Sequence, residues 1–142
     1  MLVLLSPDIC RHIILKRDEV ALTILENWSG QGDEIMLSAI TYAELVAGAL
    51  QTSDRAKHMQ LVKSFCERLD DIVAWDGKAV DQYTEIQMQA MQSGSTPNMN
   101  NAMLAAHAIS LDARLLCMNR KHFAGIEGLK LLELEEVQES IA

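Results

Sequence analysis

The chain places four polar residues where apolar runs end or helices begin: Ser6, Glu44, Asn101 and Asn119. Their side-chain oxygens are the kind of ligand that hard divalent cations such as Mg²⁺ or Mn²⁺ prefer. Only Glu44 is an acid, and a hydroxyl and two amides complete a coordination shell without offsetting the charge of the ion. The set therefore resembles a metal-assisted reaction site from which most of the negative charge has been removed.

Short apolar runs alternate with amphipathic segments, which predicts strands alternating with helices. The strand candidates are residues 1–5, 34–37, 72–75, 115–118 and 129–134. Helices are expected over residues 7–14, 20–28, 38–50, 54–69, 78–92 and 98–110. These crossovers are long enough for parallel pairing, so we expect a single α/β domain over residues 1–142. Its three-layer fold would have a central, mostly parallel sheet of four or five short strands flanked by helices.

The four polar residues can meet only at one edge of such a sheet. Ser6 follows the first strand and Asn119 follows the fourth, whereas Glu44 and Asn101 lie on helices that can face the same crevice. In an open parallel sheet, ligands bind at the carboxyl ends of the strands. We therefore expect a candidate site at this edge.

The overall charge argues against a protein that coats nucleic acid. The 142 residues carry a formal net charge of −8, whereas phosphate neutralisation needs clustered lysines and arginines. Two small basic groups are present, at residues 11–17 and 114–122, and each is consistent either with phosphate contacts or with solvated surface charge.

The cysteines and the hydropathy indicate the compartment. Cys10, Cys66 and Cys117 are odd in number and form no CxxC pair, so we interpret them as small apolar side chains in a reducing environment. No apolar run approaches the ~18 residues that a membrane span needs. A cytoplasmic protein without a membrane anchor is the expectation.

Four segments resemble the PIN-domain ribonucleases of the VapC toxin type. Residues 5–10 read LSPDIC, where the family has the form LDTNIC, and residues 38–45 read SAITYAEL, close to the family's SAITxAEL. Residues 100–108 resemble the family's NDLLIAAHA helix. Residues 115–123, followed by GLKL at 128–131, resemble its last site strand. The resemblance covers nearly the whole chain.

This resemblance implies which residues form the site. It carries the family's metal-binding acids onto Ser6, Glu44, Asn101 and Asn119, and it implies Mg²⁺ or Mn²⁺ as cofactor. Three of the four positions are neutral here, which weakens the expected metal binding. Asp8, two residues after Ser6, is a further candidate ligand or else a first-turn helix acid that interacts with the dipole.

Other polar residues have structural alternatives. Ser38 or Thr41 is expected to cap the helix that carries Glu44, and Thr41 and Glu44 also have the spacing of a capping box. Asp76 is expected to cap a helix rather than bind metal. His107 is expected to be a hydrogen-bonded core histidine. Arg120 and Lys121 either contact phosphate or flank a loop.

Three functional hypotheses follow. The first is a VapC-like protein of a toxin–antitoxin type system whose nuclease activity is lost or weak, kept for binding RNA or a VapB-like antitoxin. The second is an active Mg²⁺-dependent endoribonuclease toxin that uses Glu44 and Asp8. The third is a structural or binding subunit without catalysis. The resemblance also implies a homodimer.

Overall fold

The computed structural model describes residues 1–141 and contains a five-stranded sheet in which every pairing is parallel. The strands are β1 (Leu2–Leu5), β2 (Glu34–Ser38), β3 (Asp71–Val73), β4 (Arg114–Cys117) and β5 (Lys130–Glu133). They lie in the order β3-β2-β1-β4-β5, so the first strand in sequence is central. The predicted α/β class and parallel sheet are confirmed.

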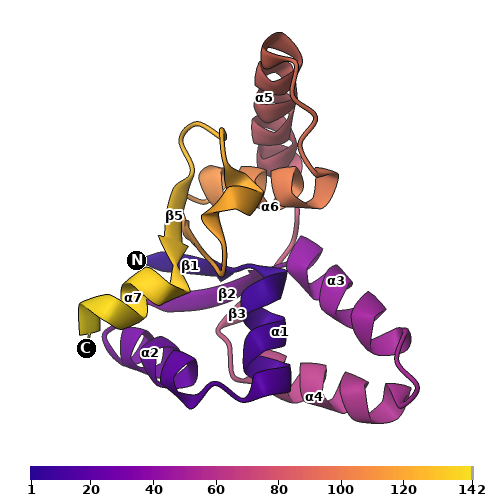
Figure 1. Cartoon of the computed structure of the whole chain (residues 1–142), viewed down its shortest axis with the longest axis vertical. Coiled ribbons are helices and arrows are strands. Elements are labelled where there is room, and N and C mark those ends of the chain that lie inside the picture. Colours follow the sequence, from indigo (N-terminus) through magenta and orange to yellow (C-terminus); the bar gives the residue numbers. More distant parts are fainter. Residues whose placement is uncertain (142) are drawn as a thin grey trace.

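Helices cover both faces of this sheet (Figure 1). They are α1 (Pro7–Lys16), α2 (Glu19–Gly30), α3 (Ala39–Leu50), α4 (Arg55–Glu67), α5 (Gly77–Ser93), α6 (Met99–Ser110) and α7 (Leu134–Ile141), with a 3₁₀ turn η1 (Arg120–Phe123). Among the described residues, no helix has the length and apolarity that crossing a membrane requires.

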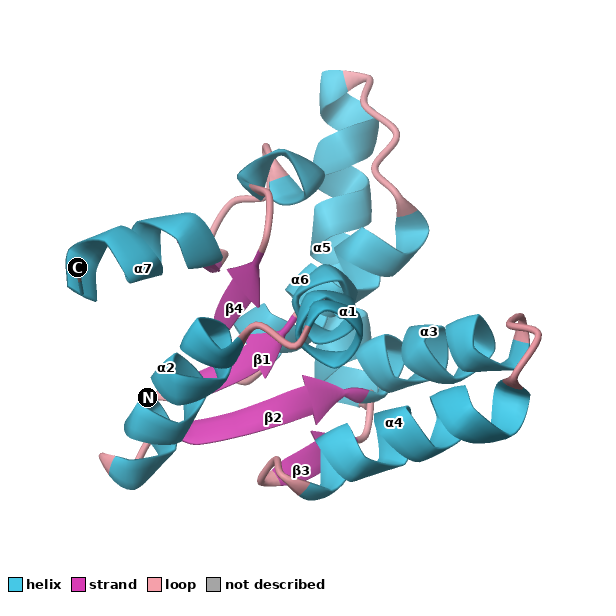
Figure 2. Cartoon of the chain, turned by 60° about the horizontal axis from the view of Figure 1, so that its bottom comes forward, coloured by secondary structure: helices cyan, strands magenta, loops and turns pink. Residues whose placement is uncertain are grey.

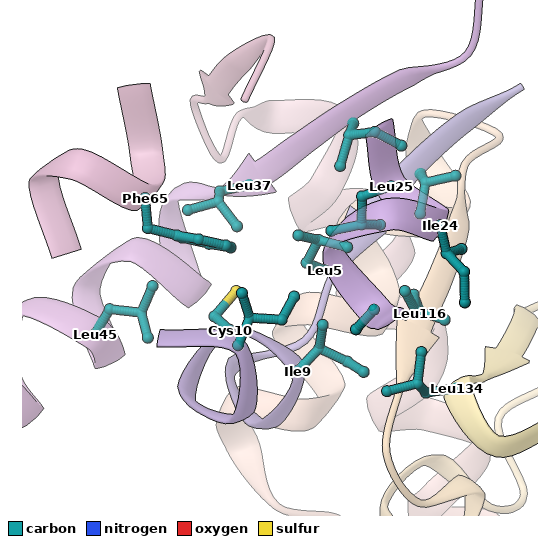
Figure 3. Packing of buried hydrophobic residues seen from close by; sticks show 14 of the residues in the cluster. Leu5, Ile9, Cys10, Ile24, Leu25, Leu37, Leu45, Phe65, Leu116 and Leu134 are labelled. Carbon is teal, nitrogen blue, oxygen red and sulfur yellow. The ribbon is translucent and has the colours of Figure 1, made fainter. Parts of the chain in front are cut away.

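Alternating residues of the central strands build two separate cores. Val3 and Leu5 of β1 face a cluster with α1, α2, α3, α4 and α7, and part of that cluster is drawn in Figure 3. Leu4, between them, faces a second cluster made with α5, α6 and η1. Because successive strand side chains point to opposite faces, one short apolar run fills both layers.

The observed helix starts agree with the sequence-based predictions more closely than the observed strand ends do. A polar N-cap side chain accepts a backbone N–H at the start of each of α1 to α6, from Ser6, Asp18, Ser38, Asp54, Asp76 and Asn98 respectively. Asp76 is thus the expected cap. Of the two caps that the sequence offers for α3, Ser38 is confirmed and the capping box at Thr41 is wrong, because the Thr41 hydroxyl instead donates to the Leu5 carbonyl at 3.1 Å.

Two elements were not predicted, and one strand was misplaced. Residues 120–123 and 134–141 form η1 and α7, for which the sequence predicts no helix. The apolar run ending at Leu134 did not show where β5 stops, whereas Glu135 and Glu136 in the first turn favour a helix start through the dipole. Strand β3 ends at Val73, not residue 75, since Trp75 turns to donate from Nε1 to the Met103 carbonyl at 3.0 Å.

The predicted core histidine joins three elements. His107 of α6 is 1% exposed, and its Nδ1 lies 2.7 Å from Ser38 Oγ at the end of β2. Burial lowers the pKa of His107, although Asp76 and the hydrogen bond with the Ala74 backbone oppose this effect. The imidazole is therefore neutral in the folded chain and ties α6 to the sheet edge near the candidate site.

We expect the free energy of unfolding to fall as the pH drops below 6.5, the ordinary pKa of histidine, because the unfolded chain then binds a proton that folded His107 resists. Above that pH this contribution is fully present. Urea unfolding at a series of pH values measures it. His107→Gln should lose this part of the pH dependence and about 1–3 kcal/mol of stability. An unchanged pH profile in that variant would rule out His107 as the source.

Candidate functional site

Ser6 lies at the carboxyl end of the central strand and is committed to local structure. Its backbone N–H donates to the Leu116 carbonyl of β4 at 2.9 Å, which extends the sheet pairing by one residue. Its hydroxyl caps α1 by accepting the Ile9 N–H at 3.4 Å, and the residue is only 2% exposed. Ser6 is therefore placed beside the end of β4, as predicted, but as a buried cap.

Glu44 projects from the second turn of α3 toward the start of α6. Its Oε1 accepts a hydrogen bond from Asn100 Nδ2 at 2.9 Å, and the side chain is 26% exposed. Residues 44 and 100 are far apart in the chain, so this contact connects two crossovers. It places Glu44 next to the helix turn that carries Asn101.

Asn101 and Asn119 both support the turn after β4. Asn101 Nδ2 donates to the His122 carbonyl at 3.3 Å, so this side chain joins α6 to η1. Asn119 caps η1 by accepting the Lys121 N–H on Oδ1 at 3.0 Å. The structure thus links Glu44, Asn101 and Asn119 through neighbouring contacts at the predicted edge of the sheet.

The further candidate Asp8 and two side chains outside the predicted set, those of Arg11 and His122, lie together at the same edge. The Arg11 guanidinium lies 2.5 Å from Asp8 Oδ1 through one nitrogen and 3.8 Å from Glu44 Oε2 through another. His122 Nδ1 lies 3.1 Å from the second oxygen of Asp8. Asp8 is therefore a first-turn helix acid of α1, as one of the two sequence alternatives has it, and its carboxylate is paired with Arg11 and His122.

Sequence reasoning missed Arg11, Asn100 and His122 as neighbours of the candidate site. The spacing of Asp8 and Arg11, one helical turn apart, does contain the signal for their ion pair. The contacts of Glu44 with Asn100 and of Asp8 with His122 have no such local signal, because they depend on how distant elements pack.

The donors at this edge do not fit a divalent cation. Of the implied ligands, Ser6 and Asn119 have their oxygens engaged by backbone N–H groups, and Asn101 directs its amide N–H at a carbonyl. The two carboxylates, Asp8 and Glu44, already share a guanidinium. Within residues 1–141, no three His, Cys, Asp or Glu side chains gather as a metal-binding group.

Arg120, the first basic residue after Asn119, contacts the C-terminal helix. Arg120 makes an ion pair with Glu136 of α7 at 2.6 Å and its backbone N–H donates to Glu133 at 3.1 Å. The hydrogen bonds that Arg120 donates to the Glu136 carboxylate raise the pKa of Arg120 further. Arg120 therefore attaches α7 to η1.

An apolar groove of about 150 Å³ adjoins the cleft. It lies between α1, α3 and α4, which run next to one another in Figure 2. The apolar lining includes Ile14, Leu15, Leu45, Ala49 and Val62. Arg11 and Glu44 line it as well, so the groove is continuous with the charged edge of the sheet.

The fold and this edge define a PIN domain. The profile of the PIN domain matches residues 10–129, which is most of the chain, and the chain belongs to the PIN-domain family.

Its relatives are VapC proteins of similar length. Ribonuclease VapC2 of Rickettsia felis is 28% identical over 131 residues, which cover 92% of this chain and 96% of that protein. The tRNA(fMet)-specific endonuclease VapC of Shigella flexneri is 21% identical and covers 89% of this chain and 93% of its own length.

The solved structures agree with these relatives. VapBC2 of Rickettsia felis, bound to a DNA fragment from its promoter, has a chain with a TM-score of 0.88 at 28% identity, covering 94% of this chain and 98% of that one. VapBC-1 of nontypeable Haemophilus influenzae gives 0.81 at 25% identity, with the same coverage. The predicted family is confirmed.

Replacing Arg120 with Ala should loosen α7 without unfolding the sheet, because the ion pair with Glu136 joins two surface elements. Hydrogen exchange followed by mass spectrometry should show faster exchange in residues 134–141. Lys121→Ala is the matched control at the next position, and its exchange in α7 should equal that of the parent. Equal protection of α7 in both variants would contradict this role for Arg120.

Proposed function

We propose that this chain is the VapC-type member of a toxin–antitoxin type pair, that its metal-dependent nuclease activity is lost or much reduced, and that it is kept for binding a VapB-like partner. The observation that carries this proposal is the cation already present at the site. Arg11 lies against both Asp8 and Glu44, the only two carboxylates that the active-toxin alternative could use.

The charge that metal-dependent cleavage requires supports the proposed loss of nuclease activity. A metal-assisted hydrolysis needs ions that lower the pKa of a bound water and neutralise charge developing on the phosphate. Ions of that kind are held by several acids, whereas the residues at the implied positions Ser6, Asn101 and Asn119 are neutral. Asp8 and Glu44 alone, which share the single positive charge of Arg11, would hold Mg²⁺ or Mn²⁺ weakly.

An assay of transfer RNA cleavage by the purified protein tests the proposed loss of nuclease activity. In Mg²⁺ or Mn²⁺ we expect no cleavage above a protein-free control. A variant in which Ser6, Asn101 and Asn119 are all changed to Asp should gain metal-dependent cleavage, since three added carboxylates can hold the ion. The same variant with Glu44→Gln should lose it again. Metal-dependent cleavage by the parent, abolished by Glu44→Gln, would refute the proposed loss.

A partner is supported by the complexes of the relatives and by the groove. The solved relatives named above are VapBC complexes. In this chain the groove between α1, α3 and α4 offers an apolar lining that ends at two charged residues, Arg11 and Glu44. An extended or helical segment of a VapB-like antitoxin would bury apolar side chains there and reach the cleft with its polar ones.

Substitution in the groove tests this binding surface. Leu15 is 59% exposed on α1, so Leu15→Glu should weaken capture of the antitoxin while leaving the melting temperature unchanged. Capture from an extract of the source cells, with mass spectrometry to identify the partner, measures it. Val20→Glu is the control, since Val20 is also 59% exposed but lines a different hollow on α2. Equal capture by both variants would exclude the groove.

The compartment and the assembly belong to the same proposal. Burial raises the pKa of all three cysteine thiols, that of Cys117 to about 11, which suits inert apolar side chains in a cytoplasmic, reducing setting. A homodimer is supported by apolar side chains exposed on α5, which projects from the body of the molecule in Figure 1. These are Val80, Met88 and Met91.

A further inference from the structure

We propose that Arg11 takes the place of the divalent cation at this site and holds Asp8 and Glu44 together as an internal ion pair. This inference deepens the proposed loss of metal-dependent cleavage, because it supplies the cause. It rests on the contacts of Arg11 and needs neither an RNA substrate nor a partner.

The geometry of the guanidinium is that of a bridge. Its Nη2 atom contacts Asp8 Oδ1 at 2.5 Å, and its Nη1 atom faces Glu44 Oε2 at 3.8 Å. A planar group with donors on two sides can serve two carboxylates at once, and it stays charged at every working pH. A lysine ammonium lacks this fork, so the arrangement depends on arginine.

Each carboxylate also has a second partner that points it inward. Glu44 Oε1 accepts from Asn100 Nδ2 at 2.9 Å, and Asp8 Oδ2 lies 3.1 Å from His122 Nδ1. The network therefore joins α1, α3, α6 and η1, which are the elements that surround the implied metal position. In an acid-rich site a metal ion would make these cross-links, and here side chains make them.

Competition favours the tethered arginine over a free ion. Arg11 stands one helical turn from Asp8 on the same rigid helix, so the cation is supplied at a high effective concentration. A divalent ion would have to displace it and would then find only two carboxylates, along with neutral groups whose oxygens are engaged. The side chains are partly exposed, 46% for Arg11, so the pair stabilises modestly and exclusion of the ion is its larger effect.

A variant that lacks the guanidinium but keeps both acids tests whether Arg11 takes the place of the metal ion. In Arg11→Gln, the carboxylates of Asp8 and Glu44 lose the cation that they share, so we expect the melting temperature to fall by about 3 °C and millimolar Mn²⁺ to restore it. The parent protein should show no shift with Mn²⁺. Loss of the free Mn²⁺ signal in electron paramagnetic resonance measures binding directly: Arg11→Gln should deplete the signal and the parent should not.

Four further variants make the result specific. Arg11→Lys keeps a positive charge but not the fork, so it should bind more Mn²⁺ than the parent and less than Arg11→Gln. Arg11→Met also removes the guanidinium and serves if Arg11→Gln does not fold. The double variant Arg11→Gln/Glu44→Gln should lose the Mn²⁺ response. Arg68→Gln removes a comparable surface ion pair, which Arg68 forms with Glu26 at 2.6 Å far from the cleft, and should show no Mn²⁺ response.

Two outcomes would overturn the inference. One is a parent protein that binds Mn²⁺ as strongly as Arg11→Gln does. The other is a folded Arg11→Gln variant that neither depletes the Mn²⁺ signal nor regains stability with the ion. An Mn²⁺-binding parent that still fails to cleave RNA would overturn this inference alone and leave the proposed function standing.

Discussion

The parallel pairing of β1 with both β2 and β4 is the constraint on which the rest of the structure depends. It places an apolar strand of four residues at the centre of the sheet, with Val3 and Leu5 in one core and Leu4 in the other. Because all pairings are parallel, every strand ends at the same edge and every connection must cross back over a face. The residues that follow the strands are gathered at that edge for this reason, and the order of connections reverses there between β1 and β4.

The carboxylates at the crevice are paired with a cationic side chain of the same chain. Acid-rich sites in general are stabilised by bound cations, since carboxylates held close together repel one another. Here most implied positions are neutral, and the two acids that remain share Arg11, with His122 beside Asp8. The same neutral side chains serve as caps and links, as Ser6 does for α1 and Asn119 for η1. Hydrogen bonds to these neutral side chains thus hold α1 and η1 at the sheet edge, where an acid-rich site would use carboxylates and a bound metal ion.

Local sequence patterns predicted most of the secondary structure. The apolar runs predicted all five strands, and the amphipathic segments between them predicted α1 to α6. The errors lie where local signals compete. Thr41 has the spacing of a capping box, but Ser38 is the cap and Thr41 is drawn to the Leu5 carbonyl by packing of α3 on β1. The boundary between β5 and α7 falls inside one apolar run, where periodicity is too short to separate strand from helix.

By itself the sequence determined the order of elements, the family and the identity of the polar residues at the strand ends, because these depend on residue type and on spacing within a segment. Only the tertiary structure decided what those residues contact. Glu44 meets Asn100, and Asp8 meets His122, across separations that no local pattern encodes. The sequence contained Arg11 one turn after Asp8, but it took the packing of α1 against α3 to bring Glu44 to the same guanidinium, since an ion pair forms only where the fold places both charges within reach.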